Sequence, residues 1–228
     1  IGKYNFKVIK QTLSFDDLPE DFDGLKITHI SDVHSGSFDD AEKIQYAIDL
    51  INEQNSDMVL FTGDIVNTHA TEMDPWIDTF KGIHNPKFGK FSVLGNHDYY
   101  SKTIEDTFTQ LDKYGINYLK TGKEFKFQDW TFIGDTLFTD FNLPNYNNDF
   151  LLDNAHYYLS DFKFIKYNYS SNITPQDYVK LFNEQWSWIE SYRNKENLFV
   201  VTHFLPSIKL EHPDYKNSYL TKKDVIRD

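Results

Sequence analysis

Four short stretches of the chain carry acidic, amide and imidazole side chains directly after short apolar runs. Carboxylate and amide oxygens and imidazole nitrogens are common protein ligands of divalent metal ions. Ligands delivered from several strand ends, far apart in the sequence, are what a two-metal hydrolase requires. The stretches are Asp32-Val33-His34, Gly63-Asp64, Gly95-Asn96-His97-Asp98 and Thr202-His203.

The first two stretches place acids where one or two cations could be bound. Asp32 and His34 share one loop, so a carboxylate and an imidazole can reach the same ion. In the second stretch, Gly63 permits close approach of the backbone, and the carboxylate of Asp64 could bridge two ions. Each stretch alone fits an ordinary polar loop about as well. Their shared position at strand ends is what favours the metal site.

The other two stretches add an amide, a possible acid and a further imidazole. Asn96 offers a neutral carbonyl oxygen as a ligand. His97 could donate a proton, with Asp98 as the group that orients it. His203 follows an apolar run and supplies another imidazole. Together the four stretches predict a metal centre with a proton donor beside it.

The elements that position these stretches have the character of strands in a layered domain. Short apolar or alternating runs, rich in β-branched and aromatic residues, predict strands. Because helical patterns separate several of these runs, we expect a layered α/β domain with its site at the carboxyl edge of the strands. The predicted strands are Leu25–Ser31, Met58–Thr62, Phe91–Leu94 and Leu198–Thr202.

Helices are predicted between these strands. Apolar residues at helical spacing from Ile44 to Ile51 predict the first helix, with Ser37 or Asp39 as its N-cap. The remaining helices are expected over Met73–Lys81 with Pro75 in the first turn, over Thr103–Tyr114 before Gly115, and after Thr174 as N-cap with Pro175 at the first position.

From Ile116 onward the pattern changes to short alternating runs. The runs INYL, FKF and WTFIG predict strands of a second sheet. The following segment is dense in Asn, Tyr and Phe and shows little periodicity. Two interpretations stay open for Phe138–Tyr169: a lid over the site, or an insertion that packs on the domain without catalytic contact.

Length and composition limit the class of protein. The chain of 228 residues fits one α/β domain, and it has no cysteine for a disulfide or a thiolate zinc site. Its net charge of -12 disfavours sequence-independent binding of nucleic acid. No run reaches the roughly 18 apolar residues of a membrane span, and no signal-peptide pattern opens the chain. Because the first residue is Ile1, we expect a processed product or an excised piece.

Four motifs resemble, in this order, those of the calcineurin-like metallophosphoesterase superfamily: ISDVHSGS, FTGDIVN, SVLGNHDYY and VVTHFLP. The resemblance covers about 25–203, and GNHD is among its more specific motifs. It implies a four-layer α/β/β/α sandwich with two mixed β-sheets, which we expect to lack its C-terminal strands here. Residues 25–228 would form this domain, truncated at the C-terminus, and 1–24 an N-terminal extension or an edge strand.

The same resemblance implies a set of metal ligands. Two divalent metal ions are expected as cofactors, with Mn, Fe, Zn or Mg left open. Asp32 and His34 would bind the first ion. Asn96 and His203 would bind the second, and Asp64 would bridge both.

The implied reaction is hydrolysis of a phosphoester. A metal-activated hydroxide would attack phosphorus in line with the leaving group. His97, oriented by Asp98, would stabilise the charge of the transition state or protonate the leaving alkoxide. Tyr99 and Tyr100 adjoin this loop and could line the substrate pocket, with packing in a helix or the core as the alternative.

One motif of the superfamily is missing from the sequence. A late Gly-His-x-His segment normally supplies one imidazole to each metal, but the last glycine here is Gly134. The only histidine after His203 is His212, for which we expect a surface position. Either the chain ends before the final strand, which we favour, or the protein works with fewer ligands. We expect weaker metal binding and low activity without these histidines.

The resemblance also changes along the chain. The part up to about Leu119 resembles membrane-associated bacterial phosphoesterases, and the part from Thr131 resembles soluble members of the Ser/Thr-phosphatase-like type. We expect a small phosphorylated substrate, membrane attachment only through segments outside this chain, and a cytoplasmic or membrane-associated bacterial protein. A rival hypothesis is a catalytically weak or inactive binding module that keeps the fold. A nuclease is a third, disfavoured by the acidic charge.

Overall fold

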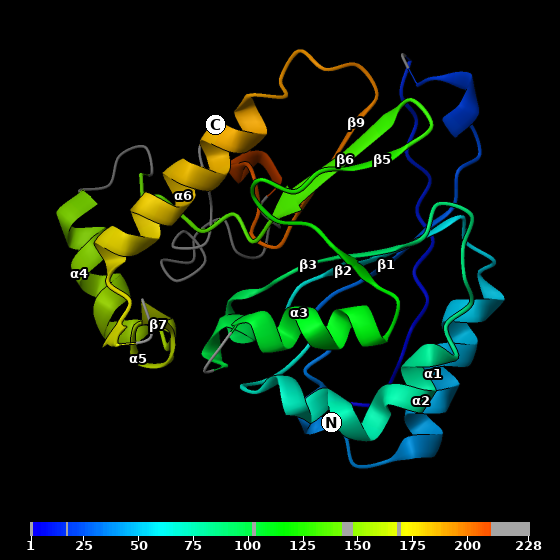
Figure 1. The fold of residues 1–228 in the computed structure, drawn as a ribbon, viewed down its shortest axis with the longest axis horizontal. Helices are drawn as coiled ribbons and strands as arrows, with labels where there is room; N and C mark the ends of the chain where they lie inside the picture. The colour runs from blue at the N-terminus through cyan, green and yellow to red at the C-terminus, as the bar shows by residue number, and fades with distance from the viewer. Residues whose placement is uncertain (1, 17, 102–103, 143–147, 168–169, 211–228) are drawn as a thin grey trace.

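The computed structural model describes residues 2–16, 18–101, 104–142, 148–167 and 170–210. Within these ranges the chain forms two main sheets with helices on their outer faces (Figure 1). His212, for which a surface position is expected, lies outside the described residues.

The first sheet is parallel in each of its pairings. Its strands are β1 (Ile27–Ile30), β2 (Met58–Thr62), β3 (Lys90–Val93) and β4 (Asn117–Tyr118), in that spatial order. The prediction that INYL belongs to the second sheet is wrong, because β4 pairs with β3 and not with FKF or WTFIG. Alternation in the sequence predicts a strand but not its partner. The helix before β4 returns the chain to the next position on the first sheet, as a parallel crossover does.

The second sheet is mixed and holds the two other predicted runs. It consists of β5 (Phe125–Phe127), β6 (Trp130–Asp135) and β9 (Leu198–Thr202). β5 pairs with β6 in the antiparallel sense, and β6 pairs with β9 in the parallel sense. The two strands β7 (Lys166–Tyr167) and β8 (Ser171–Asn172) form a separate small hairpin. The expected pair of mixed sheets is therefore one parallel and one mixed sheet.

Three helices cover the outer face of the first sheet (Figure 1). They are α1 (Ala41–Glu53), α2 (Ile77–Lys81) and α3 (Ile104–Lys113). The N-cap of α1 is Asp40, whose side chain accepts a hydrogen bond from the Lys43 N–H at 3.1 Å, so the prediction of Ser37 or Asp39 is wrong. Ser37 is instead used in the short 3-10 helix η2 (Ser35–Ser37), and the Asp39 carboxylate bonds Lys3 and Tyr4.

The other predicted helices lie near their expected positions, but part of one of them is a 3-10 helix. The expected helix around Pro75 is split into the 3-10 helix η3 (Ala70–Trp76) and then α2. Gly115 follows α3 with φ +66°, a conformation that glycine adopts without a steric penalty. The shorter 3-10 helices are η1 (Glu20–Phe22), η4 (Asn96–Tyr100) and η5 (Ile208–Leu210).

The segment after β6 forms a helical insertion with its own core. It contains α4 (Asn148–Tyr158) and α5 (Asp161–Phe164), and the longer helix α6 (Pro175–Glu190) follows it. Thr174 caps α6 as predicted, because its hydroxyl oxygen accepts from the Asp177 N–H at 3.2 Å. Among the described residues, no helix combines the length and the apolar character needed to cross a bilayer.

Buried side chains lie on both faces of the first sheet. Neighbouring residues of a strand point to opposite faces, so β2 contributes to two cores. Val59 and Phe61 pack with the α1–α3 side, whereas Leu60 packs between the sheets. There Phe132 stacks on Phe91 with ring centroids 5.2 Å apart. With α6 outside the second sheet, the layers are helix, sheet, sheet and helix (Figure 1).

The insertion packs as an aromatic cluster beside these layers. Its buried residues include side chains from the loop after β6 and from each of α4, α5 and α6. The segment is therefore packed, as the second interpretation expects, but Asp161 within it also contacts the predicted ligand Asn96, so the expected lack of contact with the site does not hold. The cluster contains Phe138, Phe141, Leu151, Ala155, Phe162, Ile165, Ile173 and Tyr178.

The N-terminal residues 2–16 form neither a helix nor a strand. Their polar anchor is Tyr4, whose hydroxyl donates to Asp39 Oδ1 at 2.7 Å, and Lys3 Nζ lies 2.7 Å from Asp39 Oδ2. This is the geometry of an extension tied to the domain. The boundary between 1–24 and the domain 25–228 stays a prediction.

Phe132→Ala tests the core between the sheets. Phe132 is fully buried, so truncation should lower the free energy of unfolding by about 3–5 kcal/mol through lost contacts and a cavity. Urea unfolding measures this difference. Phe150→Ala is the matched control, because Phe150 is 52% exposed on α4 and should cost about 0.5 kcal/mol. Equal losses in the two variants would contradict the assignment of the core.

Candidate metal centre

The four predicted stretches meet where strands of both sheets end. Asp32, Asp64 and Asn96 follow the parallel strands β1, β2 and β3, and His203 follows β9. Parallel strands bring their carboxyl ends to one edge, so these side chains come together although they are far apart in sequence. The second sheet joins the first here, because His203 Nδ1 donates to the Thr62 carbonyl at 2.6 Å.

The backbone at this edge adopts an uncommon conformation at three of the predicted ligands. Asp32, His34 and Asp64 have φ values of 53°, 47° and 53°, in the left-handed region that few non-glycine residues occupy. Backbone hydrogen bonds hold two of these residues: Asp32 N–H donates to Gly63 O at 3.1 Å, and His34 N–H to Asp64 O at 2.9 Å. Such strain persists where the surrounding structure fixes it, and it gathers at functional sites.

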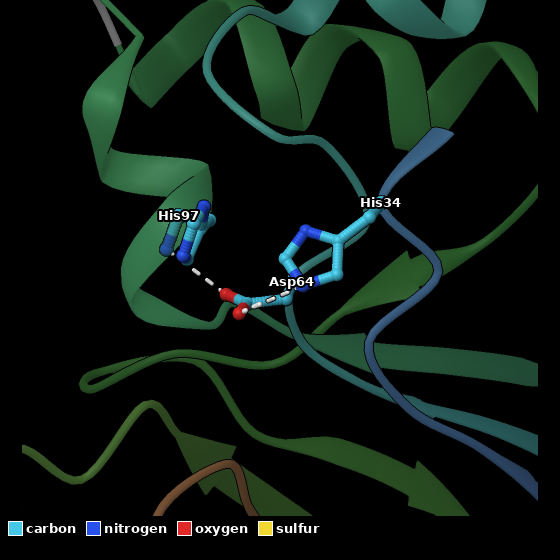
Figure 2. A group of neighbouring side chains, drawn as sticks. All are labelled: His34, Asp64 and His97. Atoms are coloured by element: carbon cyan, nitrogen blue, oxygen red, sulfur yellow. Dashed lines mark hydrogen bonds and ion pairs between the residues drawn. The ribbon is translucent and has the colours of Figure 1, made fainter. Parts of the chain in front are cut away.

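The carboxylate of Asp64 lies between two imidazole rings. His34 Nε2 is 3.6 Å from Asp64 Oδ2, and His203 Nε2 is 3.9 Å from Asp64 Oδ1. Figure 2 shows Asp64 between His34 and His97, whose backbone N–H donates to Asp64 Oδ1 at 2.9 Å. The two imidazole contacts are longer than hydrogen bonds and reach different oxygens of one carboxylate.

The other two predicted ligands stand on either side of this carboxylate. Asp32 Oδ1 is 4.0 Å from His34 Nε2, and the Asp32 side chain is 58% exposed at the rim of the site. Asn96 Oδ1 is 3.3 Å from His203 Nε2. Each predicted ligand is therefore close to another one. These contacts bring together Asp32, His34, Asp64, Asn96 and His203.

The ring of His97 is held from its Nδ1 side. Nδ1 donates to the Asn67 carbonyl at 2.8 Å, which fixes the orientation of the ring. His34 meets this ring edge-on with centroids 4.8 Å apart, and Tyr100 lies over it at 4.5 Å. Ligand atoms of His34, Asp64 and His97 all lie within 4.8 Å of one another, so His97 is also close enough to be a ligand.

The buried carboxylate of Asp98 accepts hydrogen bonds from four backbone N–H groups. Its Oδ2 accepts from Asp64 at 2.9 Å and Gly95 at 2.8 Å, and its Oδ1 from Ile65 at 3.0 Å and Val66 at 3.2 Å. These bonds tie the loop after β2 to the loop after β3. A direct role of Asp98 in orienting the His97 ring stays a prediction, since the ring bonds Asn67.

Burial dominates the electrostatics of the two acids. It raises the pKa of the Asp64 carboxyl, while the adjacent His203, His97 and His34 act in the opposite direction. Burial and the nearby charge of Asp64 raise the pKa of Asp98 to about 7, against the effect of its N–H donors. Two buried acids side by side favour a cation at Asp64.

Two glycines allow the strand ends to approach this closely. A Cβ atom on Gly63 would lie 2.6 Å from His203 Nδ1 and 2.4 Å from Gly95 N. A Cβ atom on Gly95 would lie 2.2 Å from Asp64 Oδ1. All three distances are far below van der Waals contact, so no other residue fits at these two positions without moving the predicted ligands.

The two predicted substrate residues have different surroundings. Tyr99 packs on Phe138, and its hydroxyl accepts from Thr136 Oγ1 at 3.1 Å, which joins it to the core. Tyr100 instead lies over His97, and its hydroxyl bonds the Asp161 carboxylate. Of the pair, Tyr100 is next to the site, and a substrate contact by either residue stays a prediction.

Glu72 was not among the predicted site residues. Its carboxylate accepts from the backbone N–H groups of Asn67 at 2.6 Å, Thr68 at 3.1 Å and His69 at 3.2 Å. It thereby fixes the loop whose Asn67 carbonyl holds His97. Glu72 lies three residues after the N-cap His69, a capping-box spacing that the sequence does contain. Asp161, which contacts Asn96, was also not predicted, and no sequence pattern around it indicates this contact.

The donor set fits a divalent metal ion. Carboxylate and amide oxygens with imidazole nitrogens suit hard or borderline ions such as Mg, Mn, Fe or Zn. At 3.6 and 3.9 Å, the imidazole nitrogens of His34 and His203 face the Asp64 oxygens without a hydrogen bond between them. His203 and His97 also carry the backbone contacts that commonly orient metal-site histidines.

Comparison with known proteins identifies the family and the fold. The family model for calcineurin-like phosphoesterases matches residues 25–228. The crystal structure of phosphopantetheinyl hydrolase from Mycobacterium tuberculosis superposes with a TM-score of 0.60 and 12% identity, over 88% of this chain and 75% of that one. At this identity the likeness concerns the fold.

Three relatives match parts of the sequence. A transmembrane protein with a metallophosphoesterase domain from Danio rerio is 30% identical over 54% of this chain. The uncharacterized metallophosphoesterase YkuE of Bacillus subtilis is 36% identical over 36% of it, and the UDP-2,3-diacylglucosamine pyrophosphatase LpxG of Chlamydia muridarum is 30% identical over 36%. The matches span 29%, 29% and 25% of these relatives, less than a third of each.

Asp98→Asn tests the join between the two loops. An amide oxygen cannot accept four N–H bonds, and the amide NH2 would face N–H donors, so at pH 8 stability should fall by about 3 kcal/mol. Urea unfolding measures the loss. Asp49→Asn, an exposed acid on α1, is the control and should change stability by less than about 0.5 kcal/mol. A loss at Asp98 no larger than that at Asp49 would refute the anchoring role.

Proposed function

The chain belongs to the calcineurin-like phosphoesterase family, and we propose that it hydrolyses a small phosphoester with two divalent metal ions bound at this centre. The family supports metal-dependent hydrolysis of phosphoesters in general. The observation that carries the binuclear proposal is the position of Asp64, which faces His34 with one oxygen and His203 with the other. A carboxylate placed in this way can bind one ion through each oxygen.

The proposed ligands divide into two groups around Asp64. Asp32 and His34 would bind one ion, and Asn96 and His203 would bind the other. When bound, the two ions would supply a hydroxide at neutral pH and neutralise the charge on the phosphoryl oxygens. The protein contributes the fixed geometry, because left-handed backbone, glycine contacts and the Asp98 bonds hold the ligands in place before binding.

His97 is proposed as the acid that assists the leaving group. The Asn67 carbonyl holds Nδ1–H, so the ring cannot turn freely, and the opposite nitrogen would deliver a proton to the departing oxygen. Tyr100 lies over the ring and limits its movement. Asp98 would then serve this acid indirectly, by fixing the loops on which His97 and Asn67 lie.

The substrate class is proposed from chemistry and from one relative. A small phosphorylated compound fits the family, and the net charge of -12 disfavours a nucleic-acid substrate. Because LpxG is named as a pyrophosphatase of a diacylglucosamine nucleotide, pyrophosphate diesters belong beside monoesters and diesters in an assay panel.

A non-catalytic binding module is the competing proposal. It is motivated by the sequence, which contains no Gly-His-x-His segment to complete each metal site. Elemental analysis separates the two proposals. Two tightly bound metal ions per chain would argue against the binding module, and absence of metal after reconstitution would favour it.

Asp64→Asn tests the bridging ligand. The variant keeps the shape of the side chain but removes its charge, so binding of two ions should fall to one or none, and phosphatase activity should fall by at least about 100-fold. Metal content is measured by elemental analysis after dialysis, and activity with an aryl phosphate. Asp49→Asn on α1 is the control. Two bound ions with full activity in Asp64→Asn would rule out the proposal.

His97→Gln tests the proposed acid. We expect turnover of an alkyl phosphate to fall by about 10²–10⁴-fold, since an alkoxide leaves poorly without a proton. An aryl phosphate, whose leaving group needs less protonation, should lose much less. Metal content should stay unchanged. Equal losses for both substrates would contradict the role in leaving-group protonation, and a loss of bound metal would assign His97 as a ligand instead.

A further inference from the structure

A buried acid of the insertion contacts one of the proposed metal ligands. Asp161, the first residue of α5, is only 5% exposed. Its Oδ1 accepts from Asn96 Nδ2 at 2.7 Å, and the hydroxyls of Tyr100 and Tyr178 also donate to its carboxylate. Three donors thus surround this buried acid, as a charged carboxylate requires.

This contact decides which way the amide of Asn96 points. A carboxylate accepts hydrogen bonds but cannot donate them, so Asn96 must turn its NH2 group toward Asp161. The amide oxygen then points away from the insertion, and it lies 3.3 Å from His203 Nε2. In the opposite orientation, two oxygens would face each other at Asp161, and the NH2 group would face the metal centre. Only the observed orientation turns the amide oxygen of Asn96 toward the position where a metal ion would bind.

The acid is itself held rigidly. Phe162, its neighbour on α5, is buried in the aromatic cluster with Tyr178, and the two ring centroids are 5.1 Å apart. Phe164, at the end of α5, packs on Tyr100 at 5.2 Å. The insertion therefore presents Asp161 from a packed element rather than from a free loop.

We propose that Asp161 is a positioning residue, which fixes the Asn96 amide with its oxygen toward the metal centre. The proposal rests on the proposed function, since it assigns Asn96 a metal to bind. It gives the insertion a defined part in the reaction. Asp161 of α5 orients Asn96, a proposed ligand that follows a strand of the first sheet. Partners of this kind commonly change metal affinity by about 10–100-fold when removed.

The first test is the affinity of the 228-residue chain for Mn²⁺ alone, measured by calorimetric titration. In Asp161→Asn, the new amide can donate to Asn96 as well as accept, so the Asn96 amide is no longer held in one orientation. We expect the Mn²⁺ concentration needed for full binding to rise by about 10–100-fold. Thermal unfolding of each variant establishes that it is folded.

Asp135→Asn is the matched control. Asp135 is equally buried and also accepts three hydrogen bonds, from the Thr121 and Thr136 N–H groups and from Gln185 Nε2, but none from a proposed ligand. It should lose stability and keep its Mn²⁺ affinity within about twofold. If Asp161→Asn and Asp135→Asn bind Mn²⁺ as tightly as the unaltered chain, the proposal for Asp161 is wrong, although the metal centre stands.

The second test exchanges the two side chains. In the double variant Asn96→Asp/Asp161→Asn, the amide at 161 can donate to the carboxylate at 96, whose other oxygen again faces the metal centre. We expect this variant to bind Mn²⁺ at least about tenfold more tightly than Asn96→Asp alone, in which two acids face each other. If the double variant binds Mn²⁺ no more tightly than Asn96→Asp alone, the proposal is contradicted. This test remains valid if Asp161→Asn alone does not fold. An unaltered chain that binds no Mn²⁺ would overturn both this proposal and the proposed function.

Discussion

The hydrogen bonds of one buried carboxylate, Asp98, hold the centre together. This side chain comes from the loop after β3, yet most of its partners are N–H groups of the loop after β2. The predicted ligand Asp64 lies in the loop after β2, and Asn96 and His97 precede Asp98 in the loop after β3. A carboxylate that satisfies four buried donors is hard to replace, because each orphaned N–H would cost free energy. The relative position of three site residues therefore depends on this one group.

The same arrangement explains why the centre favours a cation. Asp64 and Asp98 are both buried, and their mutual repulsion adds to the cost of desolvation. The imidazoles of His34 and His203 offset part of this cost at Asp64. A divalent ion beside Asp64 would offset more of it. The left-handed backbone at Asp32, His34 and Asp64 is strained, and the surrounding fold holds these residues in that conformation.

Sequence reasoning located the elements that depend on local pattern. The strands Met58–Thr62 and Leu198–Thr202 and the cap at Thr174 agree with the structure residue for residue, since apolar runs and capping residues act locally. It failed where the partner is distant. The alternation of INYL does not show that Asn117 pairs with Phe91, and nothing near Asp161 in the sequence indicates its bond to Asn96. The resemblance indicated the five predicted ligands, which the structure brings together, whereas the contacts that orient them are visible only in the packed structure.

We propose that one carboxylate, Asp64, binds two metal ions at once. Electron paramagnetic resonance of the chain saturated with Mn²⁺ tests it directly, because two ions that share a bridging ligand couple their spins. We expect a broad, exchange-coupled spectrum that appears with the second equivalent of Mn²⁺. A spectrum of isolated Mn²⁺ ions, growing in proportion to added metal without coupling, would contradict it.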